Sequence, residues 1–316
     1  MKFLENLTRK PNKFQRTIGL TIQQIDLLTE KLDLHWEKAE KQRKTIHARK
    51  RKIGAGHPYK FQLLRDKLLI VLLYYKTYVS QELLGMILEI DQANISRLLK
   101  KMLPLIEKSA DPILAIYLEE AKKEYAEAKK IGTISKFFEK YPDLKDVSTD
   151  ATEQQCLRSQ DHAIQKNYYS GKKKKHTAKT QASVSSTGRV LDVSETYPGS
   201  VHDKKIIDQE ETIKKFPEKT CQRFDSGYQG IKQENPNYYI ILPTKKARGK
   251  DLSDLAKEHN QVNSKRRVIS EHIFSRIKKF RICGNLYRGC LKSYNQIFRN
   301  IASILNFKLA HSSIIM

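Results

Sequence analysis

Cysteines are few in this sequence, and no two of them form a closely spaced pair. The four are Cys156, Cys221, Cys283 and Cys290, and six residues separate the closest two. Zinc sites normally use tighter spacings such as CxxC, and intracellular proteins keep their thiols reduced. We therefore expect four free thiols with structural roles, and no zinc finger.

Long apolar runs are also missing. No run reaches the ~18 residues that a membrane-spanning helix needs, and the most apolar stretch, Leu68–Tyr75, is short and typical of a buried helix. The segment Met1–Lys10 carries charges where a signal peptide would need an apolar core. These absences argue against a membrane protein or an exported one, and they favour a cytoplasmic location.

Acidic residues are scarce relative to basic ones. The chain has 60 lysines and arginines against 35 aspartates and glutamates, a formal net charge of +25, and its pI is near 9.7. Such an excess attracts polyanions and makes their binding salt-dependent. Membrane surfaces and acidic proteins are polyanions too, but a nucleic acid is the partner that this charge favours most.

Residues 1–58 predict a basic N-terminal helical arm. Apolar side chains at helical spacing indicate an amphipathic helix from Ile22 to Trp36. The segment Lys38–Lys52 then carries eight Lys or Arg residues against one acid. This run is either a solvated helix face or an arm that contacts phosphates. On the second interpretation, Arg49 and Arg51 contact DNA.

Residues 59–110 predict a helix-turn-helix domain. The pattern indicates helices at Leu64–Tyr75, Gln81–Leu88 and Gln92–Leu103, and Ser80 is a suitable N-cap for the second. Any three-helix bundle shows similar spacing, so a plain helical bundle is the alternative. Polar residues gather towards the start of the third helix, where a recognition helix presents side chains to base edges. The DNA contacts expected there are Gln92, Asn94, Ser96, Arg97 and Lys100.

Residues 111–145 predict a helical connector, and residues 146–316 predict an α/β domain. Pro104 and Pro112 flank the start of the connector, whose helix at 113–130 has little apolar face after Leu118 and is expected to be solvated. From residue 146 the pattern changes to strands, and the order β-β-β-α-β-β-α-α predicts a mixed sheet. The expected strands are Asp146–Thr152, Lys175–Ser185, Arg189–Thr196, one ending near Asp225, and Tyr238–Leu242. The expected helices are Asp203–Phe216, 252–259, 267–280 and 293–310.

Three carboxylates occupy positions from which they could share metal ions. Asp150 lies at the end of the first predicted strand, Asp225 where another strand meets a glycine-containing turn, and Glu271 on a helix. Enzymes that transfer phosphoryl groups on DNA use two divalent ions about 3.5–4 Å apart, and Mg²⁺ prefers carboxylate oxygens. If the two strands are neighbours, they lie about 4.8 Å apart and their aspartates can share an ion. Each acid alone could equally be a turn residue or an exposed helix acid.

Ordered sequence blocks surround these acids along nearly the whole chain. They are Asp150-Ala-Thr-Glu153, Tyr169-Ser-Gly-Lys-Lys173 with His176-Thr177, Pro198-Gly-Ser-Val-His-Asp203, Asp225-Ser-Gly-Tyr-Gln-Gly230, Pro243-Thr-Lys-Lys246, and Arg267 with Glu271 and Lys278. With these blocks the sequence resembles the DDE transposases of bacterial insertion sequences, in the IS-five group and its relatives related to the eukaryotic Harbinger elements.

The resemblance implies a fold and a site. It implies that Asp150, Asp225 and Glu271 are the catalytic residues and the ligands of two Mg²⁺ ions, for which Mn²⁺ can substitute. It also implies a ribonuclease-H-like catalytic core behind the helix-turn-helix domain. Ser264 stands where the wider insertion-sequence signature has a tyrosine, so any role of that tyrosine is absent or relocated here.

Basic residues near the blocks are candidate DNA contacts. Arg267 and Lys278 fall near one helix face with Glu271, and the resemblance implies that they contact DNA near the transferred strand. Ordinary ion pairing along the helix is the alternative. Two further basic clusters, Lys172 with Lys173 and Lys245 with Lys246, are also expected to contact DNA.

A fourth acid has a sufficient structural explanation. Ser200 to Asp203 is typical of a capping box that opens a helix, so we do not expect Asp203 to be a metal ligand. His202 and His272 are left out of the metal set because histidine is a poor ligand for Mg²⁺.

These features predict a DNA transposase that binds terminal inverted repeats and then cleaves and transfers strands. Water would attack first, and the freed 3′-hydroxyl would then attack target DNA in line. A nuclease without joining activity and a non-catalytic DNA-binding regulator derived from a transposase are the alternatives. Two element ends must be brought together, so we expect a homodimer on DNA, associated with the bacterial nucleoid, with no small-molecule cofactor.

Overall fold

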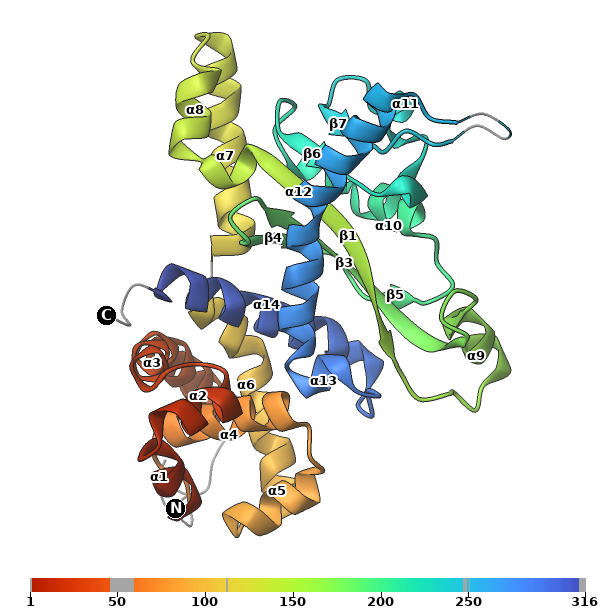
Figure 1. Ribbon diagram of the computed structural model, residues 1–316. Helices are drawn as coiled ribbons and strands as arrows, with labels where there is room; N and C mark the ends of the chain where they lie inside the picture. Colours follow the sequence, from red (N-terminus) through yellow and green to blue (C-terminus); the bar gives the residue numbers. More distant parts are fainter. Residues whose placement is uncertain (1, 46–59, 112, 247–248, 250, 313–316) are drawn as a thin grey trace. The chain divides into compact units, whose positions relative to one another are not determined.

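The computed structural model describes residues 2–45, 60–111, 113–246, 249 and 251–312. They form two compact units (Figure 1). A helical unit consists of Met1–Pro112, Ile277–Asn285 and Gln296–Met316, and a sheet unit consists of Ile113–Arg276 and Leu286–Asn295. The boundaries of these units differ from those of the predicted segments 1–58, 59–110, 111–145 and 146–316. The helical unit joins the first two segments to residues of the last one, and the sheet unit includes most of the third.

Buried apolar side chains hold the helical unit together. In α4 every side chain from Leu68 to Leu73 is buried, as expected for the most apolar run of the chain. Phe14, Ile18, Ile25 and Leu28 are also fully or almost fully buried, so the described part of residues 1–58 belongs to this core and is not a separate arm. Arg49 and Arg51 lie outside the described residues. The helices are α1 (Lys2–Thr8), α2 (Pro11–Ile18), α3 (Ile22–Thr45), α4 (Leu64–Thr77), α5 (Gln81–Leu88), α6 (Gln92–Ala110), α13 (Arg281–Gly284) and most of α14 (Tyr294–Ala310).

The predicted helix-turn-helix is present as α4, α5 and α6. Helix α5 has the predicted bounds, and Ser80 caps it, because its Oγ accepts a hydrogen bond from the Leu83 N–H at 3.1 Å. Helix α6 continues to Ala110, beyond its predicted end at Leu103, and contains Pro104. The prediction that Pro104 marks the helix exit was therefore wrong.

Asn300 supports α6 in the turn after Pro104. Its side-chain amide donates to the Leu103 carbonyl at 2.9 Å and accepts from the Glu107 N–H at 3.1 Å. Pro104 has no N–H to bond the Lys100 carbonyl, and the two Asn300 contacts strengthen the helix next to this missing bond. A residue almost two hundred positions away thus completes the helix, which local sequence could not reveal.

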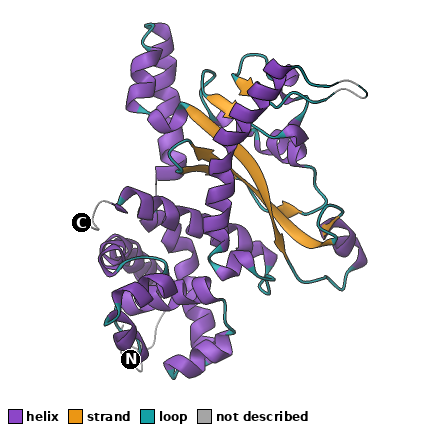
Figure 2. Ribbon diagram, in the orientation of Figure 1, coloured by secondary structure: helices purple, strands orange, loops and turns teal. Residues whose placement is uncertain are grey.

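The sheet unit contains a mixed sheet, as predicted for an α/β fold (Figure 2). The strands follow the order β2-β3-β1-β6-β7, with β4 and β5 also paired to β3. Strand β1 runs antiparallel to β3 and parallel to β6, and the predicted hairpin joins β3 to β4. The bounds are β1 (Asp146–Gln155), β2 (Tyr169–Ser170), β3 (Lys175–Ser185), β4 (Val190–Val193), β5 (Tyr197–Pro198), β6 (Cys221–Arg223) and β7 (Ile240–Ile241).

Helices and short helical turns complete the sheet unit. They are α7 (Ile113–Lys130), α8 (Ile134–Lys140), η1 (Pro142–Leu144), α9 (His162–Tyr168), α10 (Asp203–Glu210), η2 (Thr212–Lys215), η3 (Ser226–Tyr228), α11 (Ile231–Glu234), α12 (Asp254–Lys278), whose end lies in the helical unit, and η4 (Leu291–Ser293). Helix α12 is continuous where two helices were predicted.

Helix α7 is not the solvated connector that was predicted. Its Ala121 and Tyr125 are buried in one cluster with Phe137 of α8, Val147 of β1 and Phe216. These residues lie three to four positions apart on α7 or on neighbouring elements, so a narrow apolar face suffices to bury the helix. The sequence pattern did not indicate this apolar face, because the alanine side chains that form part of it are small.

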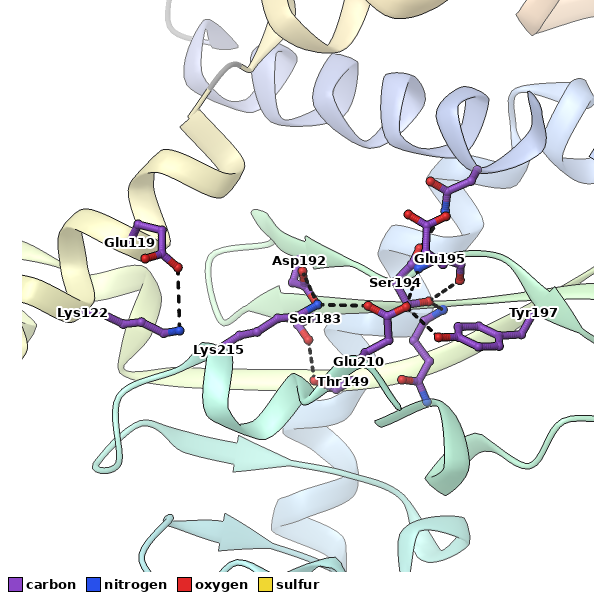
Figure 3. A network of polar contacts seen from close by, with 12 residues as sticks. Glu119, Lys122, Thr149, Ser183, Asp192, Ser194, Glu195, Tyr197, Glu210 and Lys215 are labelled. Carbon is purple, nitrogen blue, oxygen red and sulfur yellow. Dashed lines mark hydrogen bonds and ion pairs between the residues drawn. The ribbon is translucent and has the colours of Figure 1, made fainter. Parts of the chain in front are cut away.

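A polar network fastens α10 and η2 to the edge of the sheet (Figure 3). The Lys215 ammonium lies 3.0 Å from Asp192 of β4 and 3.4 Å from Glu210. Glu210 also accepts hydrogen bonds from the Tyr197 hydroxyl at 2.8 Å and from the Glu195 N–H at 2.9 Å. Helix α10 is therefore tied at its C-terminal end, which fixes the position of the acid at its first residue, Asp203.

Two absences predicted from the sequence can be compared with the structure. None of the four cysteines forms a disulfide bond, and all except Cys290 are buried. Among the helices of the described residues, none has the length and apolar character needed to cross a membrane.

Candidate active site

Asp150 lies in the middle of the long central strand β1. The strand was predicted to end at Thr152, with Asp150 at its end, but it continues to Gln155. Pairing explains the extra length, because β3 pairs with β1 from Val147 as far as Gln155. The polar residues after Thr152 resemble a loop in sequence, yet the partner strand keeps them extended.

Asp225 lies just beyond the end of β6, the strand next to the one that carries Asp150. Strands β1 and β6 are parallel, and their last paired residues are Ser148 and Arg223. Two further residues along each chain reach Asp150 and Asp225, and the charge of Asp225 acts on the Asp150 carboxyl group. The Asp225 carboxylate also accepts a hydrogen bond from the Gly227 N–H at 2.7 Å, which shapes the turn that was predicted there.

The surroundings of Asp150 raise the pKa of its carboxyl group. Burial is the largest cause and raises the pKa to about 6, against an ordinary value of 3.8. A hydrogen bond from the Ala151 N–H and the charge of Arg267 act in the opposite direction, while Asp225 and Asp203 raise the pKa further. Asp150 is therefore a buried acid that two other aspartates surround.

Asp203 is the residue that sequence reasoning set aside. It starts α10, but His202 and not Ser200 is the N-cap, since the His202 Nδ1 accepts from the Lys204 N–H at 3.3 Å. The capping-box interpretation of Ser200 was wrong, and its account of Asp203 no longer holds. Instead, the Asp203 carboxylate lies 2.8 Å from the buried ammonium of Lys179. The PGSVHD block was a signal that could have drawn attention to this acid.

The pKa of Tyr228 responds to the negative charge of the same aspartates. Its hydroxyl is buried and accepts a hydrogen bond from the Gln181 amide at 3.0 Å. Burial raises the pKa of Tyr228 well above its ordinary value, and the charges of Asp203, Asp150 and Asp225 raise it further. All three aspartates therefore act on one neutral phenol.

Glu271 and Arg267 lie on α12, which packs over β1. The Arg267 guanidinium lies 3.8 Å from the Asp150 carboxylate, and both side chains are largely buried. Glu271 is exposed and lies one helical turn further on, on the same face as Arg267. Arg267 therefore contacts Asp150, and Glu271 lies on the next turn of the same helix.

Arg223 and Arg266 anchor α12 to the first residue of β1. Arg223 binds both carboxylate oxygens of Asp146, at 2.8 and 2.9 Å, and also contacts Asn263 of α12 at 3.2 Å. Arg266 of α12 adds a contact to Asp146 at 3.0 Å. Buried charges need such complete pairing, and this pairing sets the register of α12 against the strand that carries Asp150.

The donor set suits a hard divalent cation. Asp150 in β1 and Asp225 just past the end of β6 offer carboxylate oxygens, and crowded negative charge of this kind is what Mg²⁺ neutralises. Among the described residues, however, no three histidine, cysteine, aspartate or glutamate side chains lie where they could hold one ion together. The aspartate pair fits a shared metal, and the Glu271 carboxylate does not converge with it.

The predicted DNA contacts fall on exposed parts of both units. Gln92, Asn94, Arg97 and Lys100 are exposed on α6, and Ser96 is half-buried. Within the helix, Arg97 donates a hydrogen bond to Asn94 at 2.9 Å. Four more lysines are exposed in loops of the sheet unit, and a fifth, also exposed, ends α12: Lys172, Lys173, Lys245, Lys246 and Lys278. Lys246 forms an ion pair with Asp251 at 2.7 Å.

Comparison with known proteins assigns both units. Residues 149–306, half of the chain, match the family model of the DDE superfamily endonucleases, and residues 63–112 match the helix-turn-helix of DDE superfamily endonucleases. The chain is 26% identical over 300 residues to a probable transposase for insertion sequence element IS702 from Microchaete diplosiphon, covering 94% of this chain and 95% of that protein. No solved structure was found to match. The protein therefore belongs to the family of DDE superfamily endonucleases.

Proposed function

We propose that this protein is a DNA transposase of the IS-five group and its Harbinger-related relatives, which cuts and joins DNA at the terminal inverted repeats of its element. The observation that carries the proposal is the position of two acids at the parallel pair of β1 and β6, because Asp150 and Asp225 each lie two residues beyond the last paired residues, Ser148 and Arg223. Their surroundings support it, because Asp203 and Arg267 both influence the Asp150 carboxyl. The full-length similarity to a probable insertion-sequence transposase agrees with this proposal.

In this proposal the ligands of the metal ions are Asp150, Asp225 and Glu271. Two Mg²⁺ ions, for which Mn²⁺ can substitute, would supply charge neutralisation at the transferring phosphate and would activate a hydroxyl. The carboxylates hold the ions, and Arg267, which already lies 3.8 Å from Asp150, is placed to bind a phosphate oxygen. Water attacks first at the element end, and the freed 3′-hydroxyl then attacks the target strand in line.

DNA is held by both units in this proposal. Exposed residues at the start of α6 read base edges, as recognition helices do. The lysines at 172, 173, 245, 246 and 278 hold phosphates near the site, and the basic run that includes Arg49 and Arg51 adds to this charge. A homodimer on DNA would bring two element ends together.

The test uses the full chain, Mg²⁺, a labelled duplex carrying one end of the element, and a target plasmid. Asp225→Asn should abolish both nicking and joining. Asparagine can still accept the Gly227 hydrogen bond, so the variant removes charge and keeps the turn. Asp254→Asn is the matched control, because Asp254 is an almost fully exposed acid of the same unit.

A second pair of variants tests the helix. Glu271→Gln should also abolish cleavage, whereas Glu258→Gln, at an exposed acid of the same helix, should leave it unchanged. Activity retained in Asp225→Asn would refute the metal site. Nicked product without joined product would support the nuclease alternative, and sequence-specific binding with no cleavage under any metal would support the regulator.

A further inference from the structure

A groove of about 880 Å³ lies within the helical unit, beside the recognition helix. It is bordered by α3, by residues 60–62, by α4, by the turn after α5 and by α6. Its apolar walls include Trp36, Phe61, Ile90 and Leu98. Part of this border lies outside the helix-turn-helix match, which begins at residue 63. The groove is therefore a feature of the helical unit that the family's DNA-binding motif does not cover.

Basic side chains dominate the polar lining of this groove. Of the described residues that line it, Glu89 is the single acid, and it pairs with Lys60 at 3.2 Å. The five basic residues are Arg43, Lys60, Lys67, Arg97 and Lys101. Such an excess in one depression focuses positive potential and attracts an anion with several regularly spaced charges.

Neighbouring acids compensate only part of this charge. Glu40 accepts hydrogen bonds from Arg43 at 2.9 Å and from Lys101 at 3.1 Å, and these cations hold the pKa of Glu40 at about 2 against its burial. Lys67 donates to the Gln62 carbonyl, which is neutral, at 2.8 Å. Among the described residues around the groove, the five cations thus lie close together with two carboxylates, Glu40 and Glu89, paired to them.

Two of these cations lie over the ring of Trp36. The ammonium groups of Lys67 and Lys101 lie 5.1 and 5.8 Å from the centre of its ring. Attraction to an aromatic face offsets part of the repulsion between two like charges. Burial lowers the pKa of Lys67, the charge of Glu40 raises it, and the charge of Lys101 lowers it. An anion bound between the two lysines would act in the same direction as Glu40 and reduce the repulsion between them.

The position of the groove identifies the anion. Arg97 and Asn94, which are expected to face DNA, line the same groove as Lys67 and Lys101. DNA that lies against the start of α6 would therefore carry its phosphates across the groove. A sugar-phosphate backbone has regularly spaced charges and apolar sugar faces. The charges suit the cations of the groove, and the sugar faces suit its apolar wall of Trp36 and Leu98.

We propose that this groove binds the sugar-phosphate backbone of the duplex that the helix-turn-helix reads, with Lys67 and Lys101 on successive phosphates and Trp36 against the sugar. The proposal rests on the proposed function only in so far as the protein binds DNA. It extends the DNA-binding surface from the helix-turn-helix onto α3, and it makes no use of the catalytic acids.

Trp36 is the only tryptophan of the chain, so its fluorescence reports on the groove alone. The experiment titrates the full chain with a duplex of about 30 base pairs from the DNA that flanks the gene, and with a scrambled duplex. Binding is followed by anisotropy of the labelled DNA, and Trp36 exposure by acrylamide quenching. We expect the quenching constant to fall about twofold at the DNA concentrations that saturate binding.

Charge variants test the assignment of the two lysines. Lys67→Met/Lys101→Met keeps the apolar stems over the ring and removes two charges. We expect the slope of log affinity against log salt to become shallower by about 1.8, since each lost phosphate contact contributes about 0.9. The preference for the flanking over the scrambled duplex should not change, because phosphates carry no direct sequence information. Lys67→Met alone should change the slope by about 0.9.

The matched control removes two charges elsewhere. Lys10→Gln/Lys13→Gln alters exposed lysines at and near the start of α2 and should leave both the slope and the shielding of Trp36 unchanged. Circular dichroism checks that each variant is folded. DNA binding that leaves the quenching of Trp36 unchanged would overturn the proposal, and so would equal shielding by polyglutamate. A protein that binds DNA in this way but does not cleave it would refute the proposed function and leave the groove assignment intact.

Discussion

Replacing Asp150 by asparagine should stabilise the folded protein at neutral pH while it abolishes activity. The charged form of this buried carboxyl is unfavourable beside Asp225 and Asp203, and burial is the largest cause. Asparagine removes the charge, and its side-chain oxygen can still accept the hydrogen bond that the Ala151 N–H donates at 2.8 Å. An active-site residue that costs stability is a common compromise in enzymes.

The magnitude follows from the raised pKa. A shift from 3.8 in the unfolded chain to about 6 in the folded one corresponds to about 3 kcal/mol, at 1.36 kcal/mol for each pKa unit. The attraction of Arg267 is already part of this shift. Below about pH 4 the acid is protonated in both states and costs nothing. The cost grows as the pH rises to about 6 and is then complete, so the gain in Asp150→Asn should follow the same course.

The assay is urea unfolding of the full chain in a chelator, at about pH 4.5 and about pH 8. Because the chain has two units, the unfolding midpoints of variant and wild type are compared rather than a single fitted free energy. We expect a clear increase in the midpoint for Asp150→Asn at the higher pH and a much smaller one at the lower. Equal increases at both pH values, or none, would refute this reasoning, and Asp254→Asn should show no increase at either.

Adding Mg²⁺ to the same samples gives a second measurement. A cation that binds only the folded site stabilises it by mass action, so Mg²⁺ should raise the unfolding midpoint of the wild type. It should raise that of Asp150→Asn far less, because the variant has lost one carboxylate. Equal stabilisation of both proteins would show that Asp150 does not hold the ion.

Three other changes test the elements that carry the two sites. Arg223→Met should destabilise the sheet unit by about 3 kcal/mol in urea unfolding, because Asp146 loses its bidentate partner in a largely buried position; an equal loss in Arg223→Met/Asp146→Leu would contradict this reason. Gly85→Ala should weaken DNA binding in anisotropy assays, because a Cβ there would come within 2.6 Å of the Ile90 carbonyl and disturb the turn between α5 and α6. Ser80→Ala should destabilise the helical unit by about 1 kcal/mol, the usual effect of losing an N-cap, and an unchanged melting temperature would exclude a role for this cap.

The elements that could be predicted from the sequence are those with strong local patterns. Strand β3 and helix α5 have the predicted bounds, because the turn at Ser185–Gly188 that ends the strand and the serine N-cap of the helix are local signals. The pairing of β1 with β6 was stated only as a condition, and the structure meets it. The family itself was recognisable from the ordered blocks, whose spacing reflects the site and not any single element.

What could not be predicted depends on residues that are distant in the chain. The gap expected between two helices at 260–266 is helical in α12, where the buried Asn263 accepts a hydrogen bond from Arg223 of β6. A polar residue whose partner is distant in the chain resembles a loop residue when only the local sequence is considered. The same applies to Asp203, whose significance depends on Lys179 and on its effect on Asp150.

The composition of the helical unit has a consequence for synthesis on the ribosome. Asn300 completes α6 near Leu103 and Glu107, Asn306 binds Asp111 at 2.7 Å, and all of these residues belong to the helical unit. Helices α4 to α6 emerge early, but the segment that finishes their core emerges almost two hundred residues later. A chain that stops before α14 would lack this support. On the proposed function, competence to bind DNA would be gained only after Asp150, Asp225 and Glu271 have been synthesised, so an interrupted product would not occupy element ends that it cannot cut.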